Sequence, residues 1–142
     1  LLRAAEASGL VHNVHNVAAG HTFVCNCCRC CCGQVVAARR YGLASRTFNT
    51  HYRAEIDPEA CSGCGLCTDE RCPVDAIEAA DEGFRVVAKR CLGCGLCATT
   101  CPEDAIALRL RDATERRAVP ADERDWMDQR AANRGVDYDD HR

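Results

Sequence analysis

Cys61-Ser-Gly-Cys64-Gly-Leu-Cys67 and Cys91-Leu-Gly-Cys94-Gly-Leu-Cys97 are two nearly identical stretches around which the chain is organised. Each is followed by a Cys-Pro pair, Cys72-Pro73 after the first and Cys101-Pro102 after the second. The spacing is therefore C-x2-C-x2-C-x4-C-P in the first copy and C-x2-C-x2-C-x3-C-P in the second. Thiolates separated by two residues can surround one centre only in a tight, irregular loop, which the glycines of both stretches permit.

This spacing indicates an iron–sulfur site. The second copy has the spacing that bacterial ferredoxins use for a [4Fe–4S] cluster, and the first copy has one residue more, within Thr68–Arg71. Zinc is the competing interpretation, because four-thiolate zinc sites also use C-x2-C pairs. A zinc site usually separates two such pairs and has no use for a further cysteine that is duplicated thirty residues later. The pattern therefore favours iron–sulfur over zinc or a disulfide framework.

Residues 54–110 resemble the bacterial two-cluster [4Fe–4S] ferredoxin family. The resemblance implies an α+β fold, a pseudo-twofold (βαβ)2 domain, in which the cysteine of each Cys-Pro pair serves the other cluster. By motif position, one cluster is expected to take Cys61, Cys64, Cys67 and Cys101. The other is expected to take Cys91, Cys94, Cys97 and Cys72.

Strand patterns flank the cysteines of this segment. Residues 52–57 alternate and predict a first strand, residues 77–80 and 84–87 predict a hairpin that turns at Gly83, and residues 105–110 predict a last strand. The resemblance pairs the last strand with the first. Six apolar residues on these strands are expected to shield the clusters: Ile56, Ile77, Phe84, Val86, Ile106 and Leu108.

Residues 1–53 are expected to form a small cysteine-rich α/β module. A helix over residues 1–8 should end at Gly9, and β-rich runs at 10–17 and 22–25 predict a hairpin. A helix from Val35 to Tyr41 should stop at Gly42. Between them stand six cysteines in eight positions: Cys25, Cys27, Cys28, Cys30, Cys31 and Cys32. Together with the two-cluster segment, this C-N-C-C-x-C-C-C run resembles a bacterial group of ferredoxin-like proteins.

The six-cysteine run is far denser than packing requires. In a helix, Cys25, Cys28 and Cys32 would share one face and Cys27, Cys30 and Cys31 another, so a site that used all six would need an irregular loop. We expect a third iron–sulfur cluster on four of these cysteines, with zinc or another soft metal as the alternative. Redox-active dithiols and structural thiols stay open. Three histidines could also supply imidazole ligands, and this alternative stays open too: His12, His15 and His21.

Charge is unevenly distributed along the 142 residues. Residues 1–54 contain six arginines and one acidic residue, whereas residues 55–110 contain eleven acidic and five basic residues. This pattern favours an acidic docking face for a basic redox partner, although ordinary surface charge explains it equally well. Nothing in it indicates nucleic acid, and no apolar run is long enough for a membrane span. The cysteine spacing indicates a reducing compartment, and we expect the cytoplasm. Because the chain begins with Leu1, we expect a fragment or a processed product.

The sequence predicts an electron carrier rather than an enzyme, because no nucleophile with a base and no phosphate-binding loop is recognisable. Two alternatives are an electron-relay subunit of a larger oxidoreductase and a redox or metal sensor that uses residues 25–32 as its switch. Residues 111–142 are a charged tail in which residues 122–134 predict a short helix, with Asp122 as N-cap and Gly135 after its end.

Overall fold

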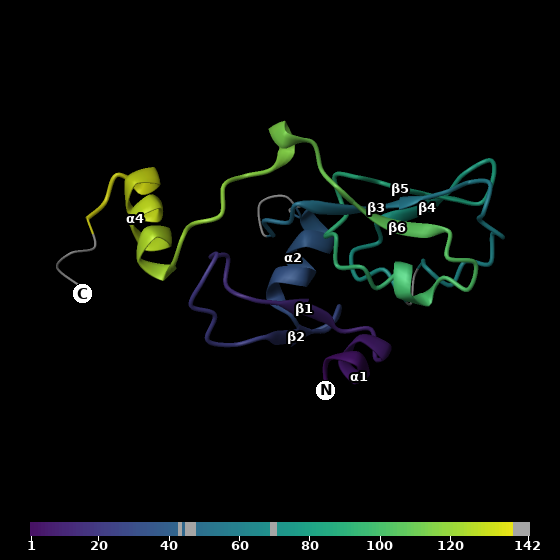
Figure 1. The fold of residues 1–142 in the computed structure, drawn as a ribbon, viewed down its shortest axis with the longest axis horizontal. Coiled ribbons are helices and arrows are strands. Elements are labelled where there is room, and N and C mark those ends of the chain that lie inside the picture. The colour runs from purple at the N-terminus through teal and green to yellow at the C-terminus, as the bar shows by residue number, and fades with distance from the viewer. Residues whose placement is uncertain (43, 45–47, 69–70, 138–142) are drawn as a thin grey trace.

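The structure, a computed structural model, describes residues 1–42, 44, 48–68 and 71–137. These residues form an α+β chain with three two-stranded antiparallel sheets (Figure 1). We call residues 54–110 the cysteine-rich segment and residues 1–53 the N-terminal module. The strands of the cysteine-rich segment lie at one end of the elongated molecule and the C-terminal helix lies at the other, with the N-terminal module between them. None of the described helices is long and apolar enough to cross a membrane.

The N-terminal module begins with helix α1 (Leu2–Ala7), which ends as predicted at Gly9. Gly9 has φ +75°, and its N–H donates to the carbonyl of Glu6 while Leu10 N–H donates to Ala5, which is the Schellman pattern. Strands β1 (Val11–Asn13) and β2 (Cys25–Cys27) then pair, with Val11 opposite Cys27. The predicted hairpin is confirmed, but its second strand begins inside the cysteine run, later than the sequence pattern indicated.

Helix α2 (Gly33–Tyr41) joins the N-terminal module to the rest of the protein. It ends at Gly42 in the left-handed conformation, as predicted. Its Val35 and Ala38 are 0% and 2% exposed, and they belong to the same buried core as Ala54 and Leu92 of the cysteine-rich segment. The two parts therefore share one hydrophobic core.

Polar contacts reinforce this shared core. The guanidinium of Arg29 pairs with the carboxylate of Asp75 at 2.8 Å. Arg71 donates to the carbonyls of Leu96 at 3.0 Å and Ala7 at 3.2 Å, which links helix α1 to the second cysteine stretch. Because the Arg29–Asp75 pair is partly exposed, its main effect is to position the two segments rather than to add much stability.

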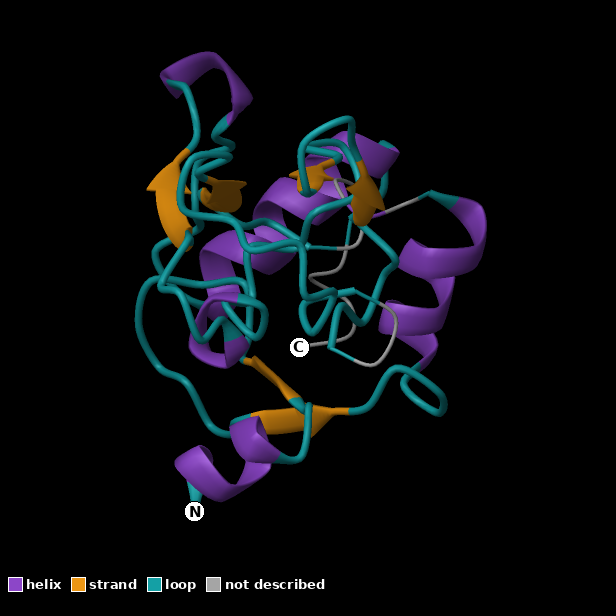
Figure 2. Cartoon of the chain, turned by 90° about the vertical axis from the view of Figure 1, so that its right-hand side faces the viewer, coloured by secondary structure: helices purple, strands orange, loops and turns teal. Residues whose placement is uncertain are grey.

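The cysteine-rich segment contains the strands that the sequence predicted. Strand β3 (Tyr52–Ile56) pairs with β6 (Ile106–Leu110), and β4 (Ile77–Ala79) pairs with β5 (Phe84–Val86). Seen from the side, these two strand pairs lie next to each other at one edge of the molecule, and the β1–β2 pair lies at the opposite edge (Figure 2).

The helices of the expected (βαβ)2 pattern are absent from the described part of this segment. Turns connect the strands, together with one 3-10 helix, η1 (Ala98–Thr100). Only three residues separate Cys97 from Cys101, which is too short for a stable α-helical nucleus. The backbone conformation nevertheless repeats in the two copies. Asp75 and Asp104 each lie three residues after the cysteine of a Cys-Pro pair, and their φ angles are 52° and 50°. The extra residue of the first copy lies within 68–71, of which 69 and 70 are outside the described residues.

The C-terminal segment returns along the N-terminal module. It contains the 3-10 helix η2 (Ala113–Glu115) and helix α4 (Glu123–Arg134). Ala18 N–H donates to the carbonyl of Pro120, which ties this segment to the β1–β2 loop. As predicted, the Asp122 side chain caps α4 by accepting from Asp125 N–H at 2.9 Å, and Gly135 ends the helix.

Candidate metal centres

Two cavities of similar volume, about 320 and 340 Å³ with the space at their mouths, lie inside the cysteine-rich segment. Each is lined by four cysteines. We call these groups the first quartet, which comprises Cys61, Cys64, Cys67 and Cys101, and the second quartet, which comprises Cys72, Cys91, Cys94 and Cys97. The cysteine of each Cys-Pro pair therefore lies with the triplet of the other repeat, in the grouping that the family resemblance implies.

The strands place apolar side chains over both cavities. Ile56, Phe84 and Ile106 line the first cavity, and Ile77 and Val86 line the second. These are five of the six residues that the sequence predicted as shields. The sixth, Leu108, is the middle residue of β6 and is 40% exposed.

Glycine brings the backbone of the cysteine loops close to their neighbours. Gly83 turns the β4–β5 hairpin against the first quartet, where an added Cβ would lie 2.9 Å from Cys61 Sγ. Gly93 has φ +66°, and an added Cβ would lie 2.2 Å from the carbonyl oxygen of Tyr52. Only glycine permits both the left-handed backbone and this approach between the second stretch and β3.

Backbone amides and one arginine stabilise the second quartet. Ala76 N–H donates to Cys72 Sγ at 3.2 Å, and Ala54 N–H and Gly93 N–H both donate to Cys91 Sγ at 3.4 Å. Arg111 donates to the carbonyls of Tyr52, Ala88 and Cys91, which joins β3 to the same loop. Arg111 could not be predicted from the sequence, because a basic residue after a strand has no signature that reveals carbonyl partners remote in the chain.

Burial raises the pKa of several thiols. The pKa of Cys94 rises to about 11 and that of Cys97 to about 12, in both cases mainly because burial disfavours the thiolate. Burial is also the main reason that the pKa values of Cys67 and Cys72 are raised. Metal binding must therefore displace these protons. Four converging thiols, tight glycine loops and amide donors aimed at sulfur fit a thiolate-ligated cluster, which is an anion that needs donors around it.

These pKa values predict how pH affects the cluster-free chain. Because Cys94 and Cys97 have higher pKa values when folded, the folded form binds their protons more tightly than the unfolded form does. This contribution to stability is complete below the ordinary thiol pKa of 9.0 and is lost as pH rises through about 11 to 12. We expect the urea midpoint of the reduced, cluster-free chain to fall across this range. The fall should be smaller in a Cys94→Ala, Cys97→Ala variant. An equal fall in both proteins would show that these two thiols do not cause the pH dependence.

The two quartets differ in their surroundings. Cys64 is exposed and the neighbouring Leu66 is 55% exposed, so the first quartet lies close to the protein surface. The loop of the second quartet borders a broad cleft that is also lined by the N-terminal module and by Trp126 of α4. The first quartet is therefore the more accessible of the two, and the N-terminal module faces the loop of the second quartet across this cleft.

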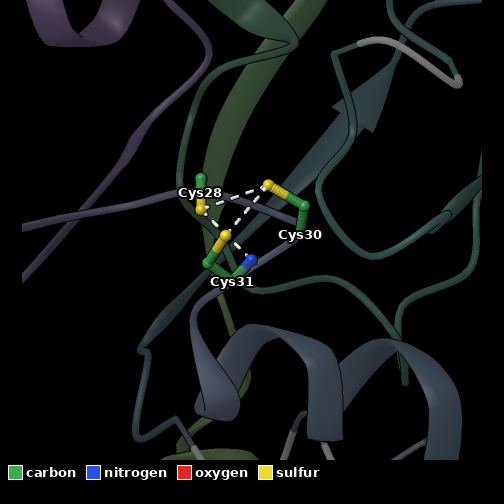
Figure 3. A group of neighbouring side chains, drawn as sticks. All are labelled: Cys28, Cys30 and Cys31. Atoms are coloured by element: carbon green, nitrogen blue, oxygen red, sulfur yellow. Dashed lines mark hydrogen bonds between the residues drawn. The ribbon is translucent and has the colours of Figure 1, made fainter.

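The six-cysteine run divides into two groups of three. It spans β2, a turn and the residue before α2, so the two helical faces considered from the sequence do not form. The sulfurs of Cys28, Cys30 and Cys31 point toward one another in the turn (Figure 3). Cys25, Cys27 and Cys32 line the broad cleft instead. We expected at least four sulfurs at one point, and the structure brings three together there.

Hydrogen bonds to sulfur shift the pKa values of two thiols in this turn. The pKa of Cys28 falls to about 6, mainly because the backbone N–H of Cys31 donates to its sulfur. The pKa of Cys31 rises to about 11, mainly through its contact with Cys30. In the other group, burial and the contact with Cys32 raise the pKa of Cys27 to about 12.

The three histidines considered as ligands lie apart from the Cys28–Cys30–Cys31 group. His12 Nδ1 is 2.8 Å from the side-chain oxygen of Asn26, directly across the β1–β2 pair and on the opposite strand face from Cys25 and Cys27. The ring of His15 packs edge-on against Phe23, with ring centroids 4.2 Å apart. His21 is exposed.

Comparison with known proteins identifies the cysteine-rich segment. Residues 54–108 match the family described as "4Fe-4S dicluster domain". No curated protein matches the sequence. The matched range contains all eight quartet cysteines and strands β3 to β5, and it ends within β6. Residues 54–108 are therefore similar to the 4Fe-4S dicluster domains of ferredoxin-type proteins.

Proposed function

We propose that this protein transfers single electrons through two [4Fe–4S] clusters, one bound by the first quartet and one by the second. The observation that supports this most strongly is the division of eight cysteines into two cavities, each completed by a cysteine from the other repeat. When bound, such a cluster accepts and releases one electron without a change of ligands. We further propose that the segment is a pseudo-twofold domain whose connecting helices are reduced to turns.

The protein's own residues suit this role. Strand side chains exclude water from both cavities, and amides that donate to Cys72 and Cys91 stabilise negative charge on sulfur. The two quartets are neighbours, since Cys67 of the first and Cys72 and Cys97 of the second belong to the same buried core. This proximity favours exchange of an electron between the two sites.

A direct test is anaerobic assembly of the full chain with iron and sulfide. We expect about eight iron and eight sulfide atoms per chain in the two cubes. Reduction should produce the spin-coupled EPR signal of two neighbouring reduced clusters, and voltammetry should show one-electron waves. Iron bound without acid-labile sulfide would contradict the proposal, because it would indicate mononuclear sites.

We propose that a redox protein with a basic face docks over the first quartet. Exposed acidic residues lie within a few positions of its cysteines, or of Gly83, in the sequence: Asp57, Glu59, Asp81, Glu82, Glu103 and Asp104. The 81–82 pair precedes Gly83, whose backbone lies against Cys61. Electron transfer weakens steeply with distance, so the accessible quartet is the better exit point, and complementary charge raises the encounter rate.

Neutralising this face should slow reaction with a cationic acceptor. We expect the Asp81→Asn, Glu82→Gln variant to reduce a small cationic complex about 3- to 10-fold more slowly at low ionic strength. The rate with an anionic acceptor should rise or stay unchanged. A control of equal charge change, Glu6→Gln with Glu123→Gln, alters helices α1 and α4 away from the first quartet (Figure 1). Equal slowing in both variants would indicate a net-charge effect and contradict the docking face.

An electron-relay subunit of a larger oxidoreductase is the second candidate. It is favoured by the broad cleft beside Cys94, which is lined by the N-terminal module and by α4 and could receive part of another subunit. For either candidate we propose a cytoplasmic location, because the free cysteine thiols of this protein suit a reducing compartment. Affinity purification from native cells separates the two candidates, because a relay subunit retains a stoichiometric partner enzyme through high salt and a free carrier does not.

A further inference from the structure

The turn between β2 and α2 contains a compact group of three thiols that the two quartets do not use. Cys30 Sγ lies 3.4 Å from Cys28 Sγ and 3.6 Å from Cys31 Sγ, and all three sulfurs lie within 4.8 Å of one another (Figure 3). Among the described residues, no other set of three or more cysteine, histidine or acidic side chains meets this limit.

The spacing of these sulfurs indicates the size of what they can bind. A single ion with metal–sulfur bonds of about 2.3 Å keeps its thiolates about 4 Å apart. A cube places each thiolate on a different iron, so its ligand sulfurs are spread more widely. The quartets follow the wider pattern, since no three of their eight thiols meet the 4.8 Å limit. The distances between the three sulfurs of the turn therefore match those around a single bound ion.

The surrounding structure holds the three thiols in place. The turn is fixed at one end by the last residue of β2, Cys27, and at the other by the first residue of α2, Gly33. The Arg29–Asp75 ion pair fastens its middle to the cysteine-rich segment. Cys31 N–H donates to Cys28 Sγ at 3.2 Å, which orients that sulfur toward the other two. A site with this support needs little reorganisation to bind metal.

We propose that Cys28, Cys30 and Cys31 bind one soft metal ion of the Zn(II) or Cu(I) class through three thiolates. Thiolate ligands select such ions. Cys30 and Cys31 are exposed, so the position opposite the three sulfurs faces solvent, and the ion is exchangeable rather than enclosed. The turn is thus a separate site for one ion, not the third iron–sulfur cluster that the sequence favoured.

The test uses the full chain with its iron–sulfur clusters assembled, kept reduced and anaerobic. Zn(II) is delivered from a chelator, and Cu(I) is delivered in the same way in a separate experiment. The chelator keeps the concentration of free metal too low to attack the clusters. We expect about one equivalent bound per chain, with three sulfur ligands by X-ray absorption. The Cys30→Ser variant should lose at least about 100-fold in affinity. Cys25→Ser is the matched control, because Cys25 is an exposed cysteine of the same run in the other group, and its affinity should change less than about 3-fold.

Other outcomes would overturn the site. Binding of neither metal would exclude it, and equal losses in the two variants would indicate one thiolate site made by the whole run. Loss of iron and sulfide from Cys30→Ser would indicate a cluster in the turn. Cluster absorption and helix content show whether each variant is folded, and Cys30→Ala must reproduce the result. Iron bound by the eight quartet cysteines is counted separately, so failure here leaves the proposed electron transfer intact.

Discussion

Replacing Cys72 and Cys94 together by alanine should leave about half of the cluster iron in place, close to four atoms per chain instead of eight. Both cysteines line the second cavity, although they belong to different sequence repeats. The double variant therefore removes two of four ligands from one site and none from the other. Iron and sulfide analysis with EPR should show one remaining cluster, magnetically isolated from any partner.

The matched variant is Cys72→Ala with Cys64→Ala. These two cysteines come from the same sequence repeat but line different cavities, so both sites lose a ligand. We expect cluster iron to fall toward zero after exposure to a chelator. The opposite ranking of the two double variants would mean that each repeat binds its own cluster, which would overturn the crossed ligand assignment.

Replacing Gly93 by alanine should be the most destabilising single change in the cysteine loops. The new Cβ would lie 2.2 Å from the Tyr52 carbonyl oxygen and 2.7 Å from Thr50 Oγ1. The Tyr52 backbone cannot retreat freely, because β3 is paired with β6. We expect a loss of more than about 3 kcal/mol in unfolding free energy, from overpacking added to left-handed strain. Displacement of β3 should also weaken the bond from Ala54 N–H to Cys91 Sγ, so cluster loss should accompany the lower melting temperature.

Gly63 is the control, since it occupies the same place in the first stretch. Its φ is +70°, close to the +66° of Gly93, but an added Cβ would have no atom within 4 Å. Gly63→Ala should therefore cost only the left-handed strain, about 1 to 2 kcal/mol, and should keep both clusters. Similar melting temperatures for the two variants would show that the contact with Tyr52 has no role.

Much of the local structure could be predicted from sequence, because it depends on patterns within a few residues. Cysteine spacing identified the cysteine-rich segment, and the strand and turn patterns around the cysteines located its four described strands. Gly9, Gly42 and Gly135 end their helices as predicted, since the left-handed conformation after a helix favours glycine. The (βαβ)2 helices were expected from family resemblance alone, and the short connections that the structure describes form turns.

Tertiary structure decided how the thiols are distributed in space. Six cysteines in eight positions have no periodicity that divides them, and only the folded turn between β2 and α2 separates Cys28, Cys30 and Cys31 from the other three. The difference between the quartets has a similar origin. The two cysteine stretches are nearly identical, yet the N-terminal module faces the second stretch across the broad cleft, whereas Cys64 and Leu66 of the first stretch are exposed. Spacing determines which cysteines can bind a cluster, because ligand geometry is local, whereas burial and access depend on segments that are distant in the chain and meet only in the folded protein.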